Sequence, residues 1–326
     1  MKPEAGPKRS LALGPGAEFD RIRGIIEMLG SRASGLGDDC ALFPSGNSFF
    51  ALSTDVSVEG IHFRRDWISL EEIGWRAAAA ALSDLAAEGA EPLGLLSAVT
   101  IPEGAGEADL LKVMQGVGAA TGSVGATVSG GDLSSGPVWS IAVTVIGKTS
   151  QPVTRDGARP GDGLWVTGAL GGSRAALEAW RRGGEPQAEP RRRYARPEPR
   201  ITAGQWLAQH GARAMLDLSD GLGGDAAHLA AASGVAVEID LALVPVAHDV
   251  SQEANRLREL PERFAAEAGE DFELLVALPP DFDAAGEFAR ASEIPLTRIG
   301  TIRAGNGVRF SLEGRAVELR GFNHFG

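Results

Sequence analysis

The stretch LEEIGWRAAAAALSDLAAE, residues 70–88, predicts a central helix that carries a carboxylate within it. Its apolar residues recur at helical spacing, over a length that is typical of a core helix. Asp84 lies three residues from Ala81 and from Ala87, so it shares their apolar face. Asp is a poor helix former, and no cap is needed in the middle of a helix. We therefore interpret Asp84 as a metal ligand or as a partner of neighbouring backbone.

Five other segments also place Asp or Glu beside apolar runs and small residues. They are GLGDDCALF (35–43), STDVSVEGIHF (53–63), SGGDLSSGP (129–137), LDLSDGL (216–222) and GEDFELL (269–275). A buried carboxylate is costly unless it is paired or binds a metal, so we expect these carboxylates to gather at one site. Oxygen ligands in number suit Mg²⁺, which usually accompanies phosphates. The first hypothesis is a magnesium-dependent enzyme that acts on phosphates.

Composition narrows the class of protein. The 326 residues suit two domains of roughly 150 residues each. The net charge of -12 argues against nucleic acid as the main partner. The single cysteine, Cys40, excludes an internal disulfide and fits a reducing cytoplasm. Neither a signal peptide nor a membrane span of roughly 20 apolar residues is evident, so we expect a cytoplasmic protein without a membrane partner.

Periodicity and turn residues predict the order of elements. We expect a flexible tail at 1–17, an α/β domain at 18–150 and an α+β domain at 151–326. In the first domain the predicted helices are 19–29, 70–88 and 107–121, and the predicted strands are 49–53, 93–100 and 139–147. In the second domain the predicted helices are 173–180, 201–210, 224–233, 256–268 and 282–291, and the predicted strands are 163–167, 214–218, 236–241 and 272–278, with further strands to about 319. Residues 130–131 are expected to form a turn, and 183–199 a surface loop.

Several motifs have two interpretations, a functional one and a structural one. Asp38 and Asp39 follow two glycines that allow close approach to a ligand, although such a sequence also forms an ordinary β-turn. Cys40 has no histidine near it in sequence and is interpreted as a small apolar filler rather than a catalytic thiol. His62 is either a phosphate or substrate contact or a structural residue. The arginines at 191–193 form either an anion site or a solvated charge cluster.

Three motifs combine oxygen ligands with strand ends or glycine turns. Ser53, Thr54 and Asp55 end a strand, where alternation sends neighbouring side chains to opposite faces, so side-chain and backbone oxygens can both reach metals. Gly131 leaves amides free to cradle phosphate beside Asp132. In LDLSDGL, residues 217 and 219 share one face, and 220 lies at the turn. No GxxxxGK[ST] phosphate loop and no kinase HRD or DFG motif is present.

In their order along the chain and in their amino-acid sequences, these motifs resemble those of the thiamine-monophosphate kinase family. That family belongs to an ATP-binding superfamily with aminoimidazole ribonucleotide synthetase, selenophosphate synthetase and a hydrogenase maturation protein. The resemblance covers about residues 19–326. It rests on GDDCALF, STD-x-x-VEG-x-HF, LSDLAA-x-GA-x-P, GGD, TR-x-GA-x-PGD (154–162), D-x-SDGL, GED-x-EL and the terminal G-x-x-HF (321–325). Where the family often has GGDTT this chain has GGDLS, and Phe322 stands where the family has Tyr or Trp.

The resemblance implies a fold, a reaction and a set of site residues. The implied fold is the two-domain aminoimidazole ribonucleotide synthetase-like fold, with an N-terminal α/β domain whose sheet forms a barrel-like core in a homodimer and an α+β C-terminal domain. The implied Mg²⁺ ligands are Asp39, Ser53, Thr54, Asp55, Asp84, Asp132, Asp217 and Asp220. The implied ATP contacts are Gly131, Asp132, Arg155 and Ser219. The implied thiamine monophosphate contacts are His62, Glu270 and Phe322.

The implied reaction is the transfer of the γ-phosphoryl group of ATP to thiamine monophosphate, which gives thiamine diphosphate and ADP. Donor and acceptor are both phosphates, so several Mg²⁺ ions are expected to offset charge repulsion in an in-line displacement. A phosphate oxygen is already a nucleophile, so no covalent catalytic residue is expected. One rival is another ATP-dependent synthetase of the superfamily, acting on an amide or carbonyl oxygen. A second rival is a non-catalytic nucleotide-binding or metal-storage protein.

Overall fold

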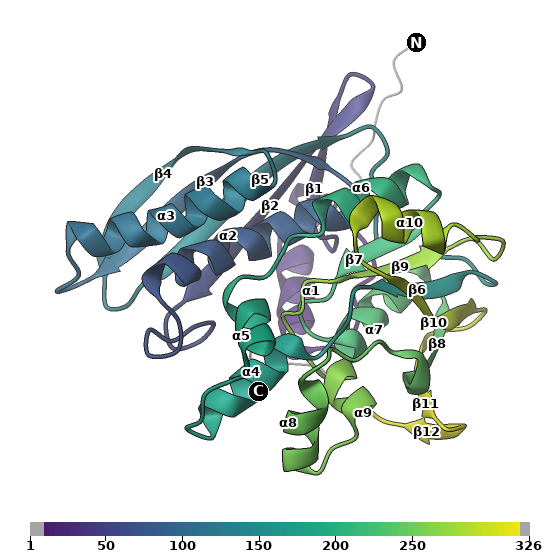
Figure 1. Cartoon of the computed structure of the whole chain (residues 1–326). Coiled ribbons are helices and arrows are strands. Elements are labelled where there is room, and N and C mark those ends of the chain that lie inside the picture. Colours follow the sequence, from purple (N-terminus) through teal and green to yellow (C-terminus); the bar gives the residue numbers. More distant parts are fainter. Residues whose placement is uncertain (1–9, 320–326) are drawn as a thin grey trace.

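Two β-sheets, one from each half of the chain, organise the structure, a computed structural model that describes residues 10–319 (Figure 1). The first sheet has the strand order β1-β2-β5-β3-β4, and the second has the order β12-β11-β8-β10-β6-β9-β7. Most neighbouring strands are antiparallel, whereas β3–β4 and β8–β11 are parallel pairs. The mixed α and β architecture in two halves therefore agrees with the fold expected from the resemblance.

The elements of the first half include the three predicted helices and three predicted strands in the predicted order, together with two strands, Ala41–Ser45 and Thr127–Gly136, that were not predicted. The elements are α1 (Ala17–Leu29), a short 3₁₀ turn η1 (Gly30–Arg32), β1 (Ala41–Ser45), β2 (Ser48–Val58), α2 (Leu70–Ala87), β3 (Glu91–Pro102), α3 (Glu107–Ser123), β4 (Thr127–Gly136) and β5 (Ser140–Thr149). Helix α2 begins at a capping box, in which Ser69 Oγ accepts from the Glu72 amide and the Glu72 carboxylate accepts from the Ser69 amide. Strand β5 alternates buried and half-buried residues, because one of its faces packs on helices.

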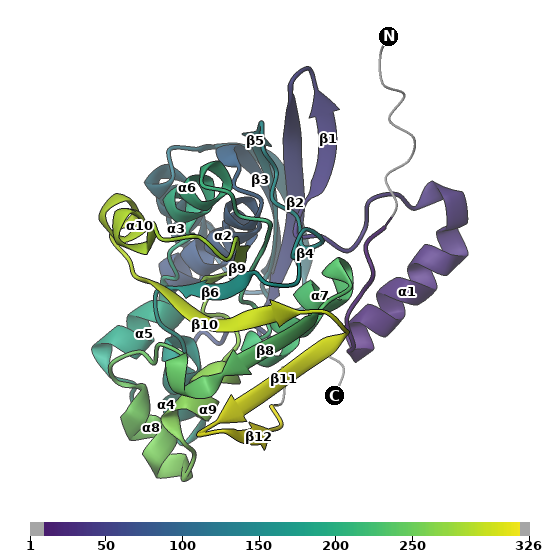
Figure 2. The ribbon, with the colours of Figure 1, turned by 90° about the vertical axis from the view of Figure 1, so that its right-hand side faces the viewer.

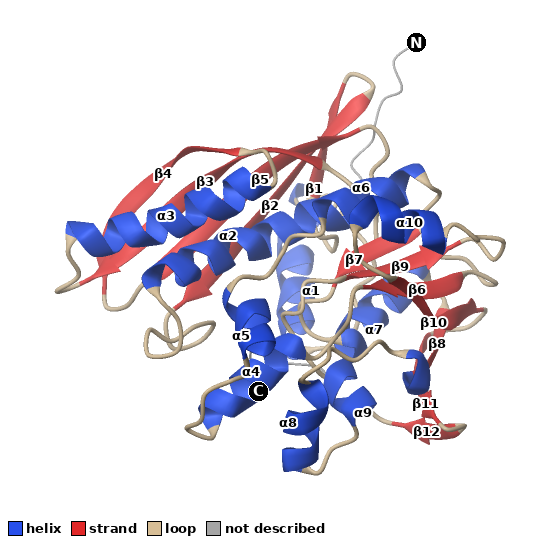
Figure 3. Cartoon of the chain, in the orientation of Figure 1, coloured by secondary structure: helices blue, strands red, loops and turns tan. Residues whose placement is uncertain are grey.

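The second half contains more and shorter elements. They are β6 (Gly163–Thr167), α4 (Gly172–Arg181), α5 (Ala188–Ala195), α6 (Ile201–Gln209), β7 (Ala214–Asp217), α7 (Leu222–Ser233), β8 (Ala236–Asp240), η2 (Leu241–Leu243), α8 (Val250–Leu257), α9 (Pro261–Ala266), β9 (Leu274–Leu278), α10 (Ala285–Ser292), β10 (Leu296–Arg303), β11 (Gly307–Leu312) and β12 (Arg315–Val317). Figure 3 shows how these helices surround the second sheet.

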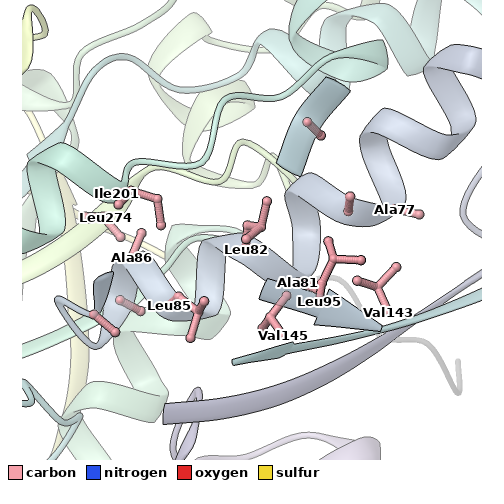
Figure 4. Close-up of a cluster of buried hydrophobic side chains, with 14 of the residues drawn as sticks. Ala77, Ala81, Leu82, Leu85, Ala86, Leu95, Val143, Val145, Ile201 and Leu274 are labelled. Atoms are coloured by element: carbon pink, nitrogen blue, oxygen red, sulfur yellow. The ribbon is translucent and has the colours of Figure 1, made fainter. Parts of the chain in front are cut away.

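Helix α2 packs between the first sheet and the second half, as the sequence pattern predicts for a central helix. Figure 4 shows Ala81 and Leu85 near Val143 and Val145 of β5, while Ala86 lies near Ile201 of α6. All of these side chains belong to one buried cluster that spans both halves. Alanines are small, so they let the helix approach its neighbours closely on several sides, and this explains the Ala-rich sequence.

Helix α1 lies on the opposite side of the first sheet from α2 and α3 (Figure 2). Of the predicted flexible tail, residues 1–9 lie outside the described part of the chain, whereas residues 10–16 are described. In this segment the amide of Leu11 donates to the backbone oxygen of Leu36 at 2.8 Å. Aromatic stacking also fixes α1, because the rings of Phe19 and His228 lie 3.7 Å apart. The N-terminal helix is thereby attached to α7 of the second half.

The prediction of a turn at Gly130 and Gly131 is wrong, because both glycines lie within strand β4. A Cβ atom on Gly131 would lie 1.9 Å from the backbone oxygen of Ser97 on the neighbouring strand. The register of β3 with β4 also shifts between Leu95 and Leu96. The glycines therefore serve a close approach of two strands at a bulge rather than a change of chain direction.

Two further expectations in the second half are corrected. The single helix expected at 256–268 is two helices, because Arg258 adopts a left-handed conformation and Pro261 starts α9. The surface loop expected at 183–199 contains the helix α5. Within α5, Glu189 pairs with arginines three and four residues later, a spacing that stabilises a helix.

Within the described residues, no helix has the length and apolar character that a bilayer span requires.

Candidate active site

Three carboxylates meet where α2 passes between the two halves. Asp39 precedes β1, Asp84 lies on α2, and Asp217 ends β7, and each offers an oxygen within 4.8 Å of the other two. Ser53 on β2 donates a hydrogen bond of 2.5 Å from its Oγ to Oδ2 of Asp84. This is an all-oxygen donor set of the kind that Mg²⁺ prefers. The structure thus brings together four residues that were predicted as metal ligands.

Burial and mutual repulsion shape the electrostatics of this cluster. Burial, with repulsion from Asp39, raises the pKa of Asp217 to about 8. The same two causes raise the pKa of Asp55, on β2, to about 6. Burial and repulsion from Asp55 hold the pKa of Asp84 well above its usual range. Carboxylates this close together repel one another when no cation is bound, whereas a divalent cation between them is attracted to all of them. The donor set therefore fits a bound metal.

Arg155 connects the cluster to the second half of the chain. Its Nε and Nη2 donate to the two carboxylate oxygens of Asp39 at 2.9 and 2.6 Å. Its backbone amide donates to Oδ1 of Asp38 at 3.2 Å, while burial raises the pKa of that carboxyl to about 7. Arg155 thus orients Asp38 and Asp39. The motif that contains these two residues, which also fitted an ordinary β-turn, therefore takes part in the carboxylate cluster.

A cleft of about 1410 Å³ lies beside this cluster. Both halves of the chain line it, and its residues include members of all three predicted groups. The predicted site residues on its wall are Asp55, His62, Arg155, Ser219, Asp220 and Glu270. The cleft is therefore large enough and polar enough to hold two anionic ligands next to the carboxylate cluster.

The two predicted substrate contacts lie in the cleft with defined partners. The amide of Val58 donates to Nδ1 of His62 at 3.0 Å, so in the neutral ring Nε2 carries the hydrogen. Glu270 adopts a φ of 60° and forms an ion pair of 2.5 Å with the buried Arg76. The third predicted contact, Phe322, lies outside the described residues.

A second group of possible metal ligands lies at the start of α7. Asp220, Asp225 and His228 each offer a ligand atom, and these atoms lie within 4.8 Å of one another. Burial lowers the pKa of His228 to about 3, which keeps its imidazole neutral. Asp225 and His228 were not among the predicted site residues, although their i, i+3 spacing directly after the LDLSDGL motif places them on one helix face.

Three other predicted residues lie apart from the carboxylate cluster in this chain. Gly131 and Asp132 belong to the edge strand β4, and β5 and β3 separate β4 from the strand that holds Asp55. Thr54 points to the outer face of the first sheet, where its Oγ1 lies 3.0 Å from that of Thr144. The Thr54 side chain therefore points away from the face that carries the side chains of Ser53 and Asp55.

Comparison with known proteins gives a consistent result along the whole chain. The N-terminal and C-terminal domain models of the AIR synthase related proteins match residues 37–149 and 159–313. The thiamine-monophosphate kinase of Aquifex aeolicus is 34% identical over 94% of this chain and 98% of its own length. The Escherichia coli K12 thiamine-monophosphate kinase is 36% identical over 94% and 95%.

Solved structures agree with the sequence relatives. AaThiL complexed with AMPPCP and TMP superposes with a TM-score of 0.85, at 33% identity over 95% of this chain and 97% of that chain. The hydrogenase maturation protein HypE in complex with ATP superposes with a TM-score of 0.69 at 21% identity, over 96% and 98%, and shares the fold.

Proposed function

This chain belongs to the thiamine-monophosphate kinase family of AIR synthase related proteins, and we propose that it uses ATP to phosphorylate thiamine monophosphate to thiamine diphosphate. The observation that carries the proposal is the shared cleft. One cavity is lined by the arginine and serine of the nucleotide motifs, by the histidine and glutamate of the substrate motifs, and by Asp55, the neighbour of the carboxylate cluster. A relative with the same fold is described in complex with AMPPCP and TMP.

In the proposed reaction, residues of this chain position the two substrates, and the phosphoryl group passes directly from one phosphate to the other. An oxygen of the thiamine monophosphate phosphate forms a bond to the γ-phosphorus of ATP, while the bond from that phosphorus to the bridging oxygen of ADP breaks. Bound at Asp39, Asp84 and Asp217, Mg²⁺ would supply neutralisation of phosphate charge and alignment of the two reactants. Ser53 orients Asp84, and Arg155 orients Asp39.

No protein nucleophile is needed for this transfer, and the one thiol is poorly placed to act as one. Cys40 is 3% exposed, and its Sγ lies 3.4 Å from the backbone oxygen of Asp84. Burial and the surrounding carboxylates raise the pKa of the thiol well above its usual range. A protonated, buried thiol is unreactive, which favours the interpretation of Cys40 as a filler.

The family resemblance also includes a homodimer, and the first sheet offers a face for it. The pairing of β2 and β3 with β5 places Val56 and Leu96 on the face of the first sheet that is opposite to α2 and α3. These two side chains are 49% and 47% exposed, and Phe43, opposite Phe50 in the β1–β2 pair, is 55% exposed. Exposed apolar side chains on one sheet face are typical of an interface, and a second copy of the chain is the partner proposed here.

ADP release with and without thiamine monophosphate tests the proposed function. We expect Mg²⁺-dependent ADP release that requires thiamine monophosphate, with an equal amount of thiamine diphosphate found by chromatography. ADP release that requires an amide or carbonyl substrate instead would identify the synthetase alternative. Nucleotide binding without turnover on any of these substrates would identify a binding protein.

A further inference from the structure

Two of the three side chains expected to contact thiamine monophosphate, His62 and Glu270, are both linked to one buried guanidinium. Arg76 on α2 is 3% exposed, and its Nη2 lies 2.5 Å from Oε1 of Glu270. Its Nη1 donates to the backbone oxygen of Tyr194 at 2.6 Å, and its guanidinium carbon lies 4.0 Å from the centre of the Tyr194 ring. The Tyr194 hydroxyl then donates to the backbone oxygen of His62 at 3.0 Å. Arg76, which itself lines the cleft, therefore contacts Glu270 directly and is connected to His62 through Tyr194.

The buried charge of Arg76 explains why Glu270 and Tyr194 are held in place. A buried guanidinium is costly unless it is paired and hydrogen-bonded, so it fixes the groups that satisfy it. Glu270, whose side chain is 35% exposed, presents its other side to the cleft. The Nη2–Oε1 contact joins a buried cation to a carboxylate, so its strength depends on both charges.

The backbone around Glu270 is also held in an uncommon conformation. Glu270 and Phe272 have φ values of 60° and 52°, which are rare for residues other than glycine. Their amides donate to the backbone oxygens of Ser219 and Leu218 at 2.8 and 3.0 Å. Asp271, between them, accepts from two backbone amides at the start of α4. Such strain persists where surrounding contacts over-determine it, and it is concentrated at functional sites.

We propose that Arg76 and Tyr194 are positioning residues for thiamine monophosphate, with Arg76 orienting Glu270 and Tyr194 orienting the loop of His62. Helix α5, which carries Tyr194, thereby couples the second half of the chain to the substrate loop of the first half. This inference rests on the proposed function, because it assigns the substrate end of the same cleft. Both residues act through their neighbours rather than through the transferred phosphoryl group.

The variant Tyr194→Phe tests the tyrosine alone. It keeps the ring beside Arg76 and the backbone oxygen that Arg76 contacts, and it removes only the hydroxyl that supports the His62 loop. We expect the KM for thiamine monophosphate to rise about threefold to tenfold, as for the loss of one hydrogen bond, with the KM for ATP and the melting temperature close to wild type. A KM for thiamine monophosphate that stays at the wild-type value contradicts the role of Tyr194.

The pair Arg76→Met and Arg76→Lys tests the guanidinium. Arg76→Met should raise the KM for thiamine monophosphate about tenfold or more, because Glu270 loses its partner, and Arg76→Lys should recover part of the loss. In a Glu270→Gln background, Arg76→Met should add little, because the two residues act as one unit. Additive effects of the two substitutions would overturn the proposal for Arg76. If Arg76→Met does not fold, Arg76→Lys and Tyr194→Phe decide the question.

Arg191→Met is the matched control. Arg191 also lies on α5 and also pairs with α2, donating to the two carboxylate oxygens of Glu72 at 2.7 and 2.9 Å, and these two contacts involve neither His62 nor Glu270. Its kinetic constants should stay near wild type. An equal rise in KM for this variant would show that only the docking of α5 matters. Wild-type protein without thiamine monophosphate-dependent turnover would instead contradict the proposed function itself.

Discussion

At the scale of single residues, the environment of each carboxylate decides its role. Asp84 and Glu270 are both acids beside the same cleft, yet one lies among like charges and the other is paired with Arg76. Burial and repulsion raise the pKa of Asp84, so its charge is stable only with a cation nearby. Asp271 instead accepts backbone hydrogen bonds at the start of α4 and has a structural use.

The first prediction concerns Asp84→Asn, which keeps the shape of the side chain and removes its charge. Turnover at saturating Mg²⁺ should fall roughly 100-fold or more, since metal-assisted neutralisation lowers much of the barrier. Melting temperature should be unchanged or higher without metal, because one repelling carboxylate is gone. Steady-state kinetics and a melting curve check both parts. Turnover near that of wild type would remove Asp84 from the metal site.

At the scale of elements, close helix packing depends on glycines. In the contact between α2 and α3, a Cβ on Gly116 would lie 1.8 Å from the backbone oxygen of Glu71, and one on Gly74 would lie 1.9 Å from that of Val113. The two helices therefore touch through their backbones on the inner face of the first sheet. This contact sets the position of α2, and α2 carries both Asp84 and Arg76.

The second prediction follows from this contact. Gly116→Ala should lower the free energy of unfolding by about 1–3 kcal/mol, as is common when atoms are added to a filled interface. Gly118→Ala, on the same helix, is the control, because no atom lies within 4 Å of the added Cβ. It should raise the unfolding free energy by up to about 1 kcal/mol through helix propensity. Denaturant unfolding measures both, and equal effects at the two positions would contradict the close contact.

At the scale of the whole molecule, the halves meet at a cluster of acids that is stable only with protons or cations. The folded pKa values of Asp55, Asp38 and Asp217 are raised to about 6, 7 and 8 from a usual value of 3.8. A carboxyl with a raised folded pKa contributes stability that is present below its unfolded pKa and is lost as pH rises through the folded value. The metal-free protein should therefore lose stability across this window.

The third prediction is a pH-dependent effect of magnesium on melting. Without metal, the melting temperature should fall between about pH 4 and pH 8, and saturating Mg²⁺ should raise it more at about pH 8 than at about pH 4, because the cation binds the deprotonated carboxylates. Asp217→Asn should show a shallower slope in the metal-free state. A magnesium effect of equal size at both pH values would contradict this account of the cluster.

The fourth prediction concerns the exposed face of the first sheet. Sedimentation should show a dimer for wild type, and Leu96→Glu should shift it toward monomer, because a charge in an apolar interface is costly. Leu111→Glu is the control, since Leu111 is 59% exposed but lies on α3. Loss of the dimer in both variants, or in neither, would mean that this face is not the interface.

The sequence by itself determined many of the elements and the chemical character of the protein, whereas β1, β4 and α5 were not predicted. Helices α2 and α3 and strand β5 were predicted nearly to their ends, because their periodicity is a local property of neighbouring residues. The acidic motifs identified the family, which the comparisons confirmed. Local patterns failed where a break depends on one residue, as at Pro261 between α8 and α9.

Only the tertiary structure decided which of these residues meet. Residues 39, 84 and 217 come together because two sheets pack around α2, and nothing in the local sequence of any one motif encodes that distance. The same packing left Asp132 on an edge strand, added Asp225 and His228 to the cleft wall, and placed Tyr194 against Arg76. Contacts between distant segments depend on the burial of whole surfaces, so they follow from the fold rather than from the motifs.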